Sequence, residues 1–219
     1  MNDLARFLAA AQHGGSPVDL LAAFFVLGLV PLLAVSVTSF TRIVVVLGLL
    51  RASLGAQSLP PNIVIAALAM LLTGAVMAPT LSQVESTAVR PYLAHRIGAA
   101  AALQRGAEPI RQFMLRQARR SDVRAFARVA RVKGGDSESA PLSAVAPAFM
   151  VGELRSAFAM GFALALPFAV IDIVVAAGLM SLGMFMVSPA AISLPLKLLV
   201  FVVADGWTLV CGALAASFR

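Results

Sequence analysis

Three long stretches of the chain carry no charged side chain, and this feature limits the possible folds more than any other. No Asp, Glu, Lys or Arg occurs in residues 20–41, 52–84 or 173–196. Each stretch exceeds the roughly 20 apolar residues that a helix needs to cross about 30 Å of hydrocarbon. A fourth stretch, residues 198–218, is interrupted only by Asp205. The pattern predicts an all-α membrane protein.

Composition supports the same class. Of the 219 residues, 60% are hydrophobic and 12% are charged, whereas a soluble domain is about half apolar and a quarter charged. The single cysteine, Cys211, excludes an internal disulfide and a cysteine-cluster metal site. The two histidines, His13 and His95, lie far apart in the sequence. We therefore expect no metal and no cofactor.

Two apolar blocks flank one polar insert. We expect an N-terminal segment (1–18), a first helical hairpin (19–80), a basic helical insert (81–147) and a second helical hairpin (148–219). The insert holds 11 basic and 5 acidic residues, so it carries +6 of the chain's net charge of +7. Residues 111–132 have helical periodicity, with Phe126, Val129 and Ala130 on one face and arginines elsewhere.

The charge of the insert suggests three partners. Nucleic acid and anionic lipid headgroups both attract basic surfaces. Only three aromatic residues in the insert are available for base stacking, so we expect no nucleic acid. We favour a solvated helical subdomain that touches partner subunits, with lipid contact as the alternative. The excess of positive charge would place a short loop in the cytoplasm, but this rule weakens for loops of about 60 residues.

Each apolar block predicts a hairpin. The first turns through Gly55 and Pro60-Pro61, because the two prolines cannot continue a helix, and Asn62 is a candidate cap for the next helix. The second turns through residues 181–189. Pro31 and Pro167 lie inside apolar runs, Pro79 and Pro195 lie near segment ends, and these prolines predict broken helices. At membrane depth a broken helix is tolerated only when it is buried in protein or lines water, which favours an assembled pore or transporter.

Five charged residues lie within or beside the apolar runs of the second block, and each is costly in hydrocarbon, by about 2.5–3.5 kcal/mol or more. Long side chains reach the headgroups, but short aspartates do not, so we expect partners for both aspartates. The five residues are Glu153, Arg155, Asp172, Lys197 and Asp205.

The tip of the second hairpin has the sequence Gly-Met-Phe-Met-Val at residues 183–187. Large apolar side chains in a turn are unusual in water. Methionine is unbranched and deformable, so a ring of such tips would close a pore and still yield to a passing polypeptide. Hydrophobic constrictions also gate by dewetting. The alternative is ordinary packing or lipid contact.

Several long motifs are specific enough to suggest a family. They are VSVTSFTRI at residues 35–43, VLGLLR at 46–51, PPN at 60–62, PAF at 147–149, LMSLGM at 179–184, ISLP at 192–195 and DGW at 205–207. Together they resemble the FliP/SctR family, the export-gate proteins of flagellar and virulence type III secretion systems. The resemblance covers both apolar blocks, whereas the insert matches weakly.

The resemblance implies a ring of five subunits in the bacterial inner membrane, raised toward the periplasm with the insert on that side. Two other small membrane subunits complete the gate, larger export-gate and basal-body proteins surround it, and unfolded protein substrates pass through it. Flagellar members often carry a cleavable signal peptide. The start of this chain, with Asp3 beside Arg6 and no directly following apolar core, does not match one. We therefore expect the virulence branch.

The resemblance also implies roles for particular residues. A methionine-rich loop forms a gasket around the channel in the family. Met184 and Met186 match it, and Phe185 stands where another methionine is common. Glu153 and Lys197 match positions that form a salt bridge between neighbouring subunits.

The residues alone leave rival functions open. A secondary transporter would use Asp172 and Asp205 as a proton relay. An intramembrane hydrolase lacks a nucleophile–base pair here. No Gly-Lys-Ser/Thr phosphate-binding motif occurs in the sequence, so energy for export comes from elsewhere. We predict a non-enzymatic gate subunit, and no role follows for Asp172 or Asp205.

Overall fold

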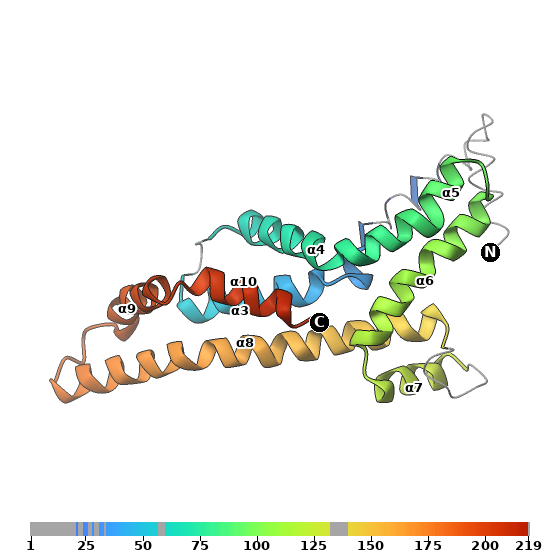
Figure 1. Ribbon diagram of the computed structural model, residues 1–219. Helices are drawn as coiled ribbons and strands as arrows, with labels where there is room; N and C mark the ends of the chain where they lie inside the picture. The colour runs from blue at the N-terminus through green and yellow to red at the C-terminus, as the bar shows by residue number, and fades with distance from the viewer. Residues whose placement is uncertain are drawn as a thin grey trace. The chain divides into compact units, whose positions relative to one another are not determined.

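A computed structural model describes residues 34–56, 60–131 and 140–218, together with residues 21, 24, 25, 28, 31 and 32. The predicted N-terminal segment, residues 1–18, lies outside the described residues. Within the described residues every regular element is a helix (Figure 1). The chain divides into two compact units, the first formed by Met1–Thr38 and Met77–Gly152 and the second by Ser39–Val76 and Glu153–Arg219.

The first unit contains the polar insert. Its elements are the end of α4 (Asn62–Val84), the π-helix η1 (Glu85–Val89), α5 (Arg90–Leu93), α6 (Ala99–Gln117), α7 (Arg120–Val129) and the start of α8 (Leu142–Ser181). Helix α6 packs against η1 and α5. Its other end meets α8, where the rings of Phe113 and Phe149 pack edge to face with centroids 5.8 Å apart. Met114, next to Phe113, is also fully buried.

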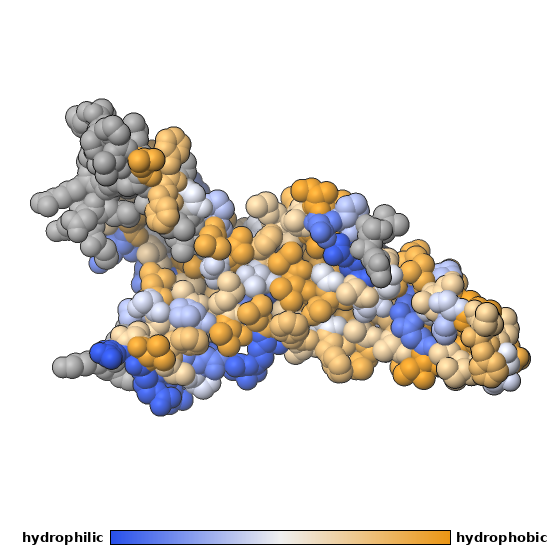
Figure 2. Space-filling view, turned by 180° about the vertical axis from the view of Figure 1, so that it is seen from behind, coloured by the Kyte–Doolittle hydropathy of each residue, from blue (hydrophilic) through white to orange (hydrophobic). Residues whose placement is uncertain are grey.

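The stretch predicted to be helical, residues 111–132, is divided between two helices. Two extended residues, Ala118 and Arg119, separate α6 from α7. Val123 and Ala127 point inward, one helical turn apart, while Val129 of the predicted apolar face is exposed. Ala118 and Arg119 have extended backbone dihedral angles, so the helix is interrupted at these two residues. Hydrophilic side chains gather over the solvent side of α7 (Figure 2).

The second unit contains α3 (Phe40–Leu54), the first part of α4, most of α8, α9 (Pro189–Val203) and α10 (Gly206–Ala216). Its core is a single apolar cluster. The members come from all five helices: Ile43, Val46, Leu47, Leu50, Leu54, Ile65, Ala69, Ala157, Phe168, Phe201, Val210 and Leu214. A side chain at Gly161 of α8 would collide with Leu49 of α3, so glycine there permits the close approach of these two helices.

Within the second block, the helix break does not lie at the proline that predicts one. Helix α8 is continuous through Pro167, which overturns the expected break. The break lies instead between α9 and α10, where Asp205 adopts a left-handed backbone with φ 49° and the axis bends by 65°. The predicted first helix is also divided, because Thr38 and Ser39 form a bend before α3.

Among the residues that the structure describes, two helical stretches are long and apolar enough to cross a membrane. They are Asn62–Leu93 and Leu142–Ser181, and the bent pair α9 and α10 is a third if both form one span. Helix α8 has 40 residues and is therefore about 60 Å long, roughly twice the thickness of the hydrocarbon. Apolar side chains cover most of the visible surface of the α8–α9 hairpin (Figure 2).

Candidate functional site

The loop of the α8–α9 hairpin is shaped by a glycine. Helix α8 ends in a Schellman motif, in which the Gly183 amide donates to the Met180 carbonyl at 3.1 Å and the Met184 amide to the Leu179 carbonyl at 2.9 Å. Gly183 takes the left-handed conformation that this motif requires, with φ 73°. The backbone therefore reverses sharply and presents the next residues at the tip.

The predicted gate residues lie at this tip and point outward. Phe185 is 80% exposed and Met186 is 99% exposed, and Met184 is also exposed. Contiguous exposed apolar side chains mark contact with a partner or a membrane. The arrangement suits a gasket made of several copies, and the gasket role stays a prediction.

A buried ion pair lies inside the second unit. Arg42 of α3 binds Glu153 of α8 with two parallel hydrogen bonds, Nε to Oε2 at 2.9 Å and Nη2 to Oε1 at 2.5 Å. Glu153 is 0% exposed and Arg42 is 3% exposed. A buried charge of this kind is tolerated only with a well-oriented partner, and the bidentate geometry provides one.

Arg42 also fixes the end of the chain. Its Nη1 donates to both the carbonyl oxygen and the hydroxyl of Ser217, each at 3.0 Å. Its guanidinium lies 3.9 Å from the centre of the Phe218 ring, a cation–π contact. One side chain thus joins α3, α8 and the residues that follow α10. This role does not follow from the residue patterns, although Arg42 is the one charged residue between Asp19 and Arg51.

A second ion pair lies on the arms of the hairpin. Lys197 of α9 donates from Nζ to Asp172 Oδ2 of α8 at 2.6 Å and to the Ser53 carbonyl of α3 at 3.1 Å. The Lys197 side chain is 6% exposed, whereas that of Asp172 is 49% exposed. The expectation that Asp172 needs a partner is confirmed within the chain.

The other predicted aspartate has a different environment. Asp205 lies in the break between α9 and α10, and its Oδ1 accepts a hydrogen bond from the Thr208 hydroxyl at 3.1 Å. It is exposed. The structure therefore places Asp172 and Asp205 in separate settings, one in an ion pair and the other at a helix start.

The two residues of the predicted bridge between subunits have other partners within one chain. Glu153 binds Arg42, and Lys197 binds Asp172. Both oxygens of the Glu153 carboxylate are occupied by the guanidinium. The bridge from Glu153 to Lys197 of a neighbouring subunit stays a prediction.

The predicted turn of the first hairpin lies between α3 and α4. Gly55 ends α3 with a left-handed backbone at φ 77°, and α4 begins at Asn62, directly after Pro60 and Pro61. Arg51 reaches across the turn and donates from Nη1 to the Asn62 side-chain oxygen at 2.5 Å and to the Pro60 carbonyl at 3.3 Å.

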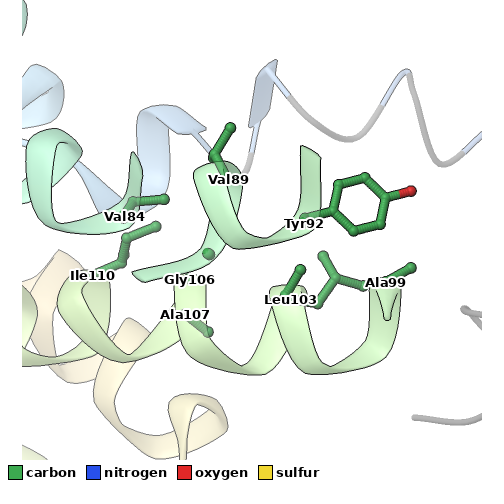
Figure 3. Close-up of a pocket in the computed structure, with 10 residues that line it drawn as sticks. Val84, Val89, Tyr92, Ala99, Leu103, Gly106, Ala107 and Ile110 are labelled. Atoms are coloured by element: carbon green, nitrogen blue, oxygen red, sulfur yellow. The ribbon is translucent and has the colours of Figure 1, made fainter. Parts of the chain in front are cut away.

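The first unit has an apolar cavity of about 510 Å³ between η1, α5 and α6 (Figure 3). Val84, Val89 and Tyr92 line one side, while Leu103 and Gly106 belong to the α6 side. Its lining offers no pair of charged groups for catalysis. Among the residues that the structure describes, no three His, Cys, Asp or Glu side chains are placed to bind a metal ion.

Comparisons with known proteins agree with the residue motifs. The model of the FliP family matches residues 23–214. The chain is 46% identical over 203 residues to the flagellar biosynthetic protein FliP of Caulobacter vibrioides, covering 92% of this chain and 76% of that protein. It is 40% identical over 221 residues to the protein of the same name from Bacillus subtilis, covering 100% of both.

A third relative has the same description. The flagellar biosynthetic protein FliP of Pectobacterium carotovorum is 48% identical over 189 residues, covering 86% of this chain and 73% of that protein. All three relatives have flagellar names, whereas the sequence analysis led us to expect the virulence branch.

Proposed function

Because the chain belongs to the FliP family, we propose that it is a subunit of the export gate of a type III secretion apparatus, through which unfolded proteins leave the cell. The observation that carries this proposal is the α8–α9 hairpin, whose apolar tip stands exposed in a single chain. Such a tip is unfavourable in water unless other copies or lipid cover it.

A ring of copies explains the surface of α8. Five side chains at four-residue steps form a stripe along this helix, and each is at least half exposed: Phe158, Phe162, Leu166, Val170 and Val174. Successive members of this series are neighbours on the helix surface, and because each step of four residues advances by about 40°, the stripe winds about 160° around α8 from Phe158 to Val174. We propose that neighbouring copies and lipid cover the stripe. By the family resemblance, five copies form the ring with two other small membrane subunits, inside larger export-gate and basal-body proteins.

The length of α8 supports an assembly that extends beyond the bilayer. A helix of 40 residues exceeds the hydrocarbon by about 30 Å. We propose a complex in the inner membrane that projects to the periplasm, with the basic insert on that side. The insert would then contact partner subunits through its helices.

The gate itself is assigned to Met184, Phe185 and Met186. Rings of flexible apolar side chains exclude water and ions when closed and deform around a polypeptide when open. The chain supplies no energy and no chemistry in this scheme, and it is not an enzyme.

Secretion by a deletion strain tests the proposal. Loss of the gene should abolish export of type III substrates to the medium, and the gene on a plasmid should restore it. Loss of motility and of flagellin export would assign the flagellar branch, whereas loss of effector export alone would assign the virulence branch. Normal secretion of both classes in the deletion strain would reject the proposal.

Purification separates a gate subunit from the rival transporter. Extraction in mild detergent with the co-expressed gate subunits should give a complex whose mass corresponds to several copies of this chain. A secondary transporter would instead work alone. Proton-coupled uptake of a small solute by vesicles that contain only this chain would support the transporter and contradict the gate.

A further inference from the structure

The segment that contains the end of α6 and all of α7 is strongly basic. Its seven cations are all arginines: Arg111, Arg116, Arg119, Arg120, Arg124, Arg128 and Arg131. Asp122, which is half-buried, is the only acidic residue of the segment. With seven cations and one anion, residues 111–131 carry a net charge of +6. Such a concentration of one sign attracts an anionic partner.

Helix α7 presents its arginines to solvent. Arg120, Arg124 and Arg128 follow one another at steps of four residues, so that successive members are neighbours on the helix surface, and all three are exposed. Arg119, directly before α7, and Arg116, in the last turn of α6, are also exposed. These five residues are named the arginine surface below.

The arginine surface begins beside a definite point of α8. A side-chain carbon at Gly152 would lie 3.9 Å from the carbonyl oxygen of Gln117, the last residue of α6. Arg155 lies three residues further along α8, about 4.5 Å, and residues 156–171 carry no charge. A long cationic side chain at the edge of an apolar span reaches toward the headgroups. The arginine surface therefore starts close to the level at which α8 would enter the hydrocarbon.

An apolar side chain stands among these cations. Val129 follows Arg128 directly and is 78% exposed, whereas Val123 and Ala127 form the buried side of α7. Helices that lie at a membrane surface carry basic side chains beside apolar ones, which enter the boundary between headgroups and acyl chains. A lipid surface accounts for the exposed valine, and water does not.

We propose that the arginine surface binds the phosphate groups of anionic phospholipids, at the surface of the membrane that α8 enters. The planar guanidinium group forms paired hydrogen bonds to phosphate oxygens, which suits a surface whose cations are all arginine. An acidic protein would also be attracted, but it explains neither the exposed Val129 nor the position of the surface along α8. The lipid contact goes beyond the proposed export function and does not depend on a channel.

Lipid preference in nanodiscs tests the proposal. The full chain is reconstituted with equal amounts of phosphatidylglycerol and phosphatidylcholine, and a trace of either lipid with a spin label reports the fraction held by the protein. A cation near an anionic surface strengthens binding roughly fivefold, so we expect a preference for phosphatidylglycerol of at least about fivefold. Salt at about 1 M, where the Debye length is about 3 Å, should remove most of it. Equal retention of both lipids, or a preference unaffected by salt, would overturn the proposal.

Two triple variants with the same change in charge locate the contact. The first removes three cations of the arginine surface: Arg119→Gln, Arg124→Gln and Arg128→Gln. The control removes three exposed arginines elsewhere in the same unit: Arg90→Gln, Arg96→Gln and Arg105→Gln. Arg105 lies 12 residues before the end of α6 at Gln117, about 18 Å along the helix. We expect the first variant to lose the preference about fivefold and the control to keep it.

The remaining outcomes separate lipid from other anions. Equal losses in the two variants would assign the preference to net charge and overturn the proposal. If the chain shows no lipid preference and the first variant loses co-purified gate subunits, the surface binds acidic protein instead. Inorganic phosphate at the headgroup concentration should not displace phosphatidylglycerol, and displacement would assign the surface to free phosphate. If thermal unfolding shows the first variant to be misfolded, the salt dependence of the parent decides.

Discussion

Two ion pairs of the second unit both join a basic side chain to a carboxylate, but they differ in how far the carboxylate is exposed to water. Arg42 and Glu153 are sealed inside the protein, with the guanidinium bound to a carboxylate, a carbonyl and a hydroxyl. Lys197 is buried too, but its partner Asp172 is half exposed. Burial therefore distinguishes the two pairs, since water is excluded from the first and reaches the Asp172 carboxylate of the second.

The largest effect is expected from breaking the sealed pair. Arg42→Met leaves Glu153 buried without a partner, which costs about 3–5 kcal/mol, and releases Ser217 and Phe218. We expect little folded protein after detergent extraction, measured by size-exclusion chromatography and thermal unfolding. Adding Glu153→Leu removes the orphan charge and should recover much of the stability. An equally unstable double variant would show that the contacts to the C-terminal residues matter more than the pair.

The next effect concerns the partner of Lys197. Lys197→Glu places two carboxylates together, which costs a few kcal/mol, and should prevent assembly, measured by the mass of the purified complex. The structure predicts rescue by Asp172→Lys, which restores an ion pair within the chain. The predicted bridge between subunits implies rescue by Glu153→Lys instead, although this change would place a lysine beside Arg42. Rescue by Glu153→Lys alone would reject the intrachain pair as the important one.

A smaller effect on stability is expected from a substitution that changes packing and leaves every charge in place. Gly161→Ala inserts a methyl group where Leu49 lies, and overpacking of this kind costs about 1–3 kcal/mol. The matched control is Gly178→Ala in the same helix, where nothing lies within 4 Å of the added carbon, and it should be neutral or slightly stabilising. Thermal unfolding of both variants measures the difference, and equal midpoints would contradict the close approach of α3 and α8.

The smallest effect is expected at a pair on the surface of the first unit. Glu85 and Arg90 lie 3.0 Å apart, and both side chains are more than half exposed. Exposed pairs contribute about 0.2–1 kcal/mol, so Glu85→Gln should change the unfolding midpoint little. A decrease in the unfolding midpoint as large as that of Arg42→Met would show that burial does not determine how much each ion pair stabilises the protein.

Much of the helical framework follows from the sequence because it depends on local chemistry. The charge-free stretches predict apolar helices, and Pro60 and Pro61 predict the turn before α4. The break between α6 and α7 does not follow, because Ala118 and Arg119 are extended there although alanine and arginine are good helix formers. The continuity of α8 through Pro167 shows that a proline within an apolar run can be accommodated without ending the helix.

Part of the candidate site can likewise be predicted from the sequence, and part of it cannot. The tip residues 184–186 stand out in the sequence because large apolar side chains are unusual in a turn. The partners of the charged residues do not, because pairing is a long-range property. Arg42 and Glu153 are separated by 111 positions, and Lys197 and Ser53 by 144. An isolated charge in an apolar segment signals the need for a partner without identifying it.

Ion conductance of the assembled complex is the sharpest test of the proposed gate. Purified complexes are placed in planar bilayers, with the parent chain compared with a variant in which Met184, Phe185 and Met186 are all glycine. We expect a closed parent and a variant of equal mass that conducts ions. Indistinguishable conductance of the two complexes would contradict a gate closed by the tips of the second hairpin.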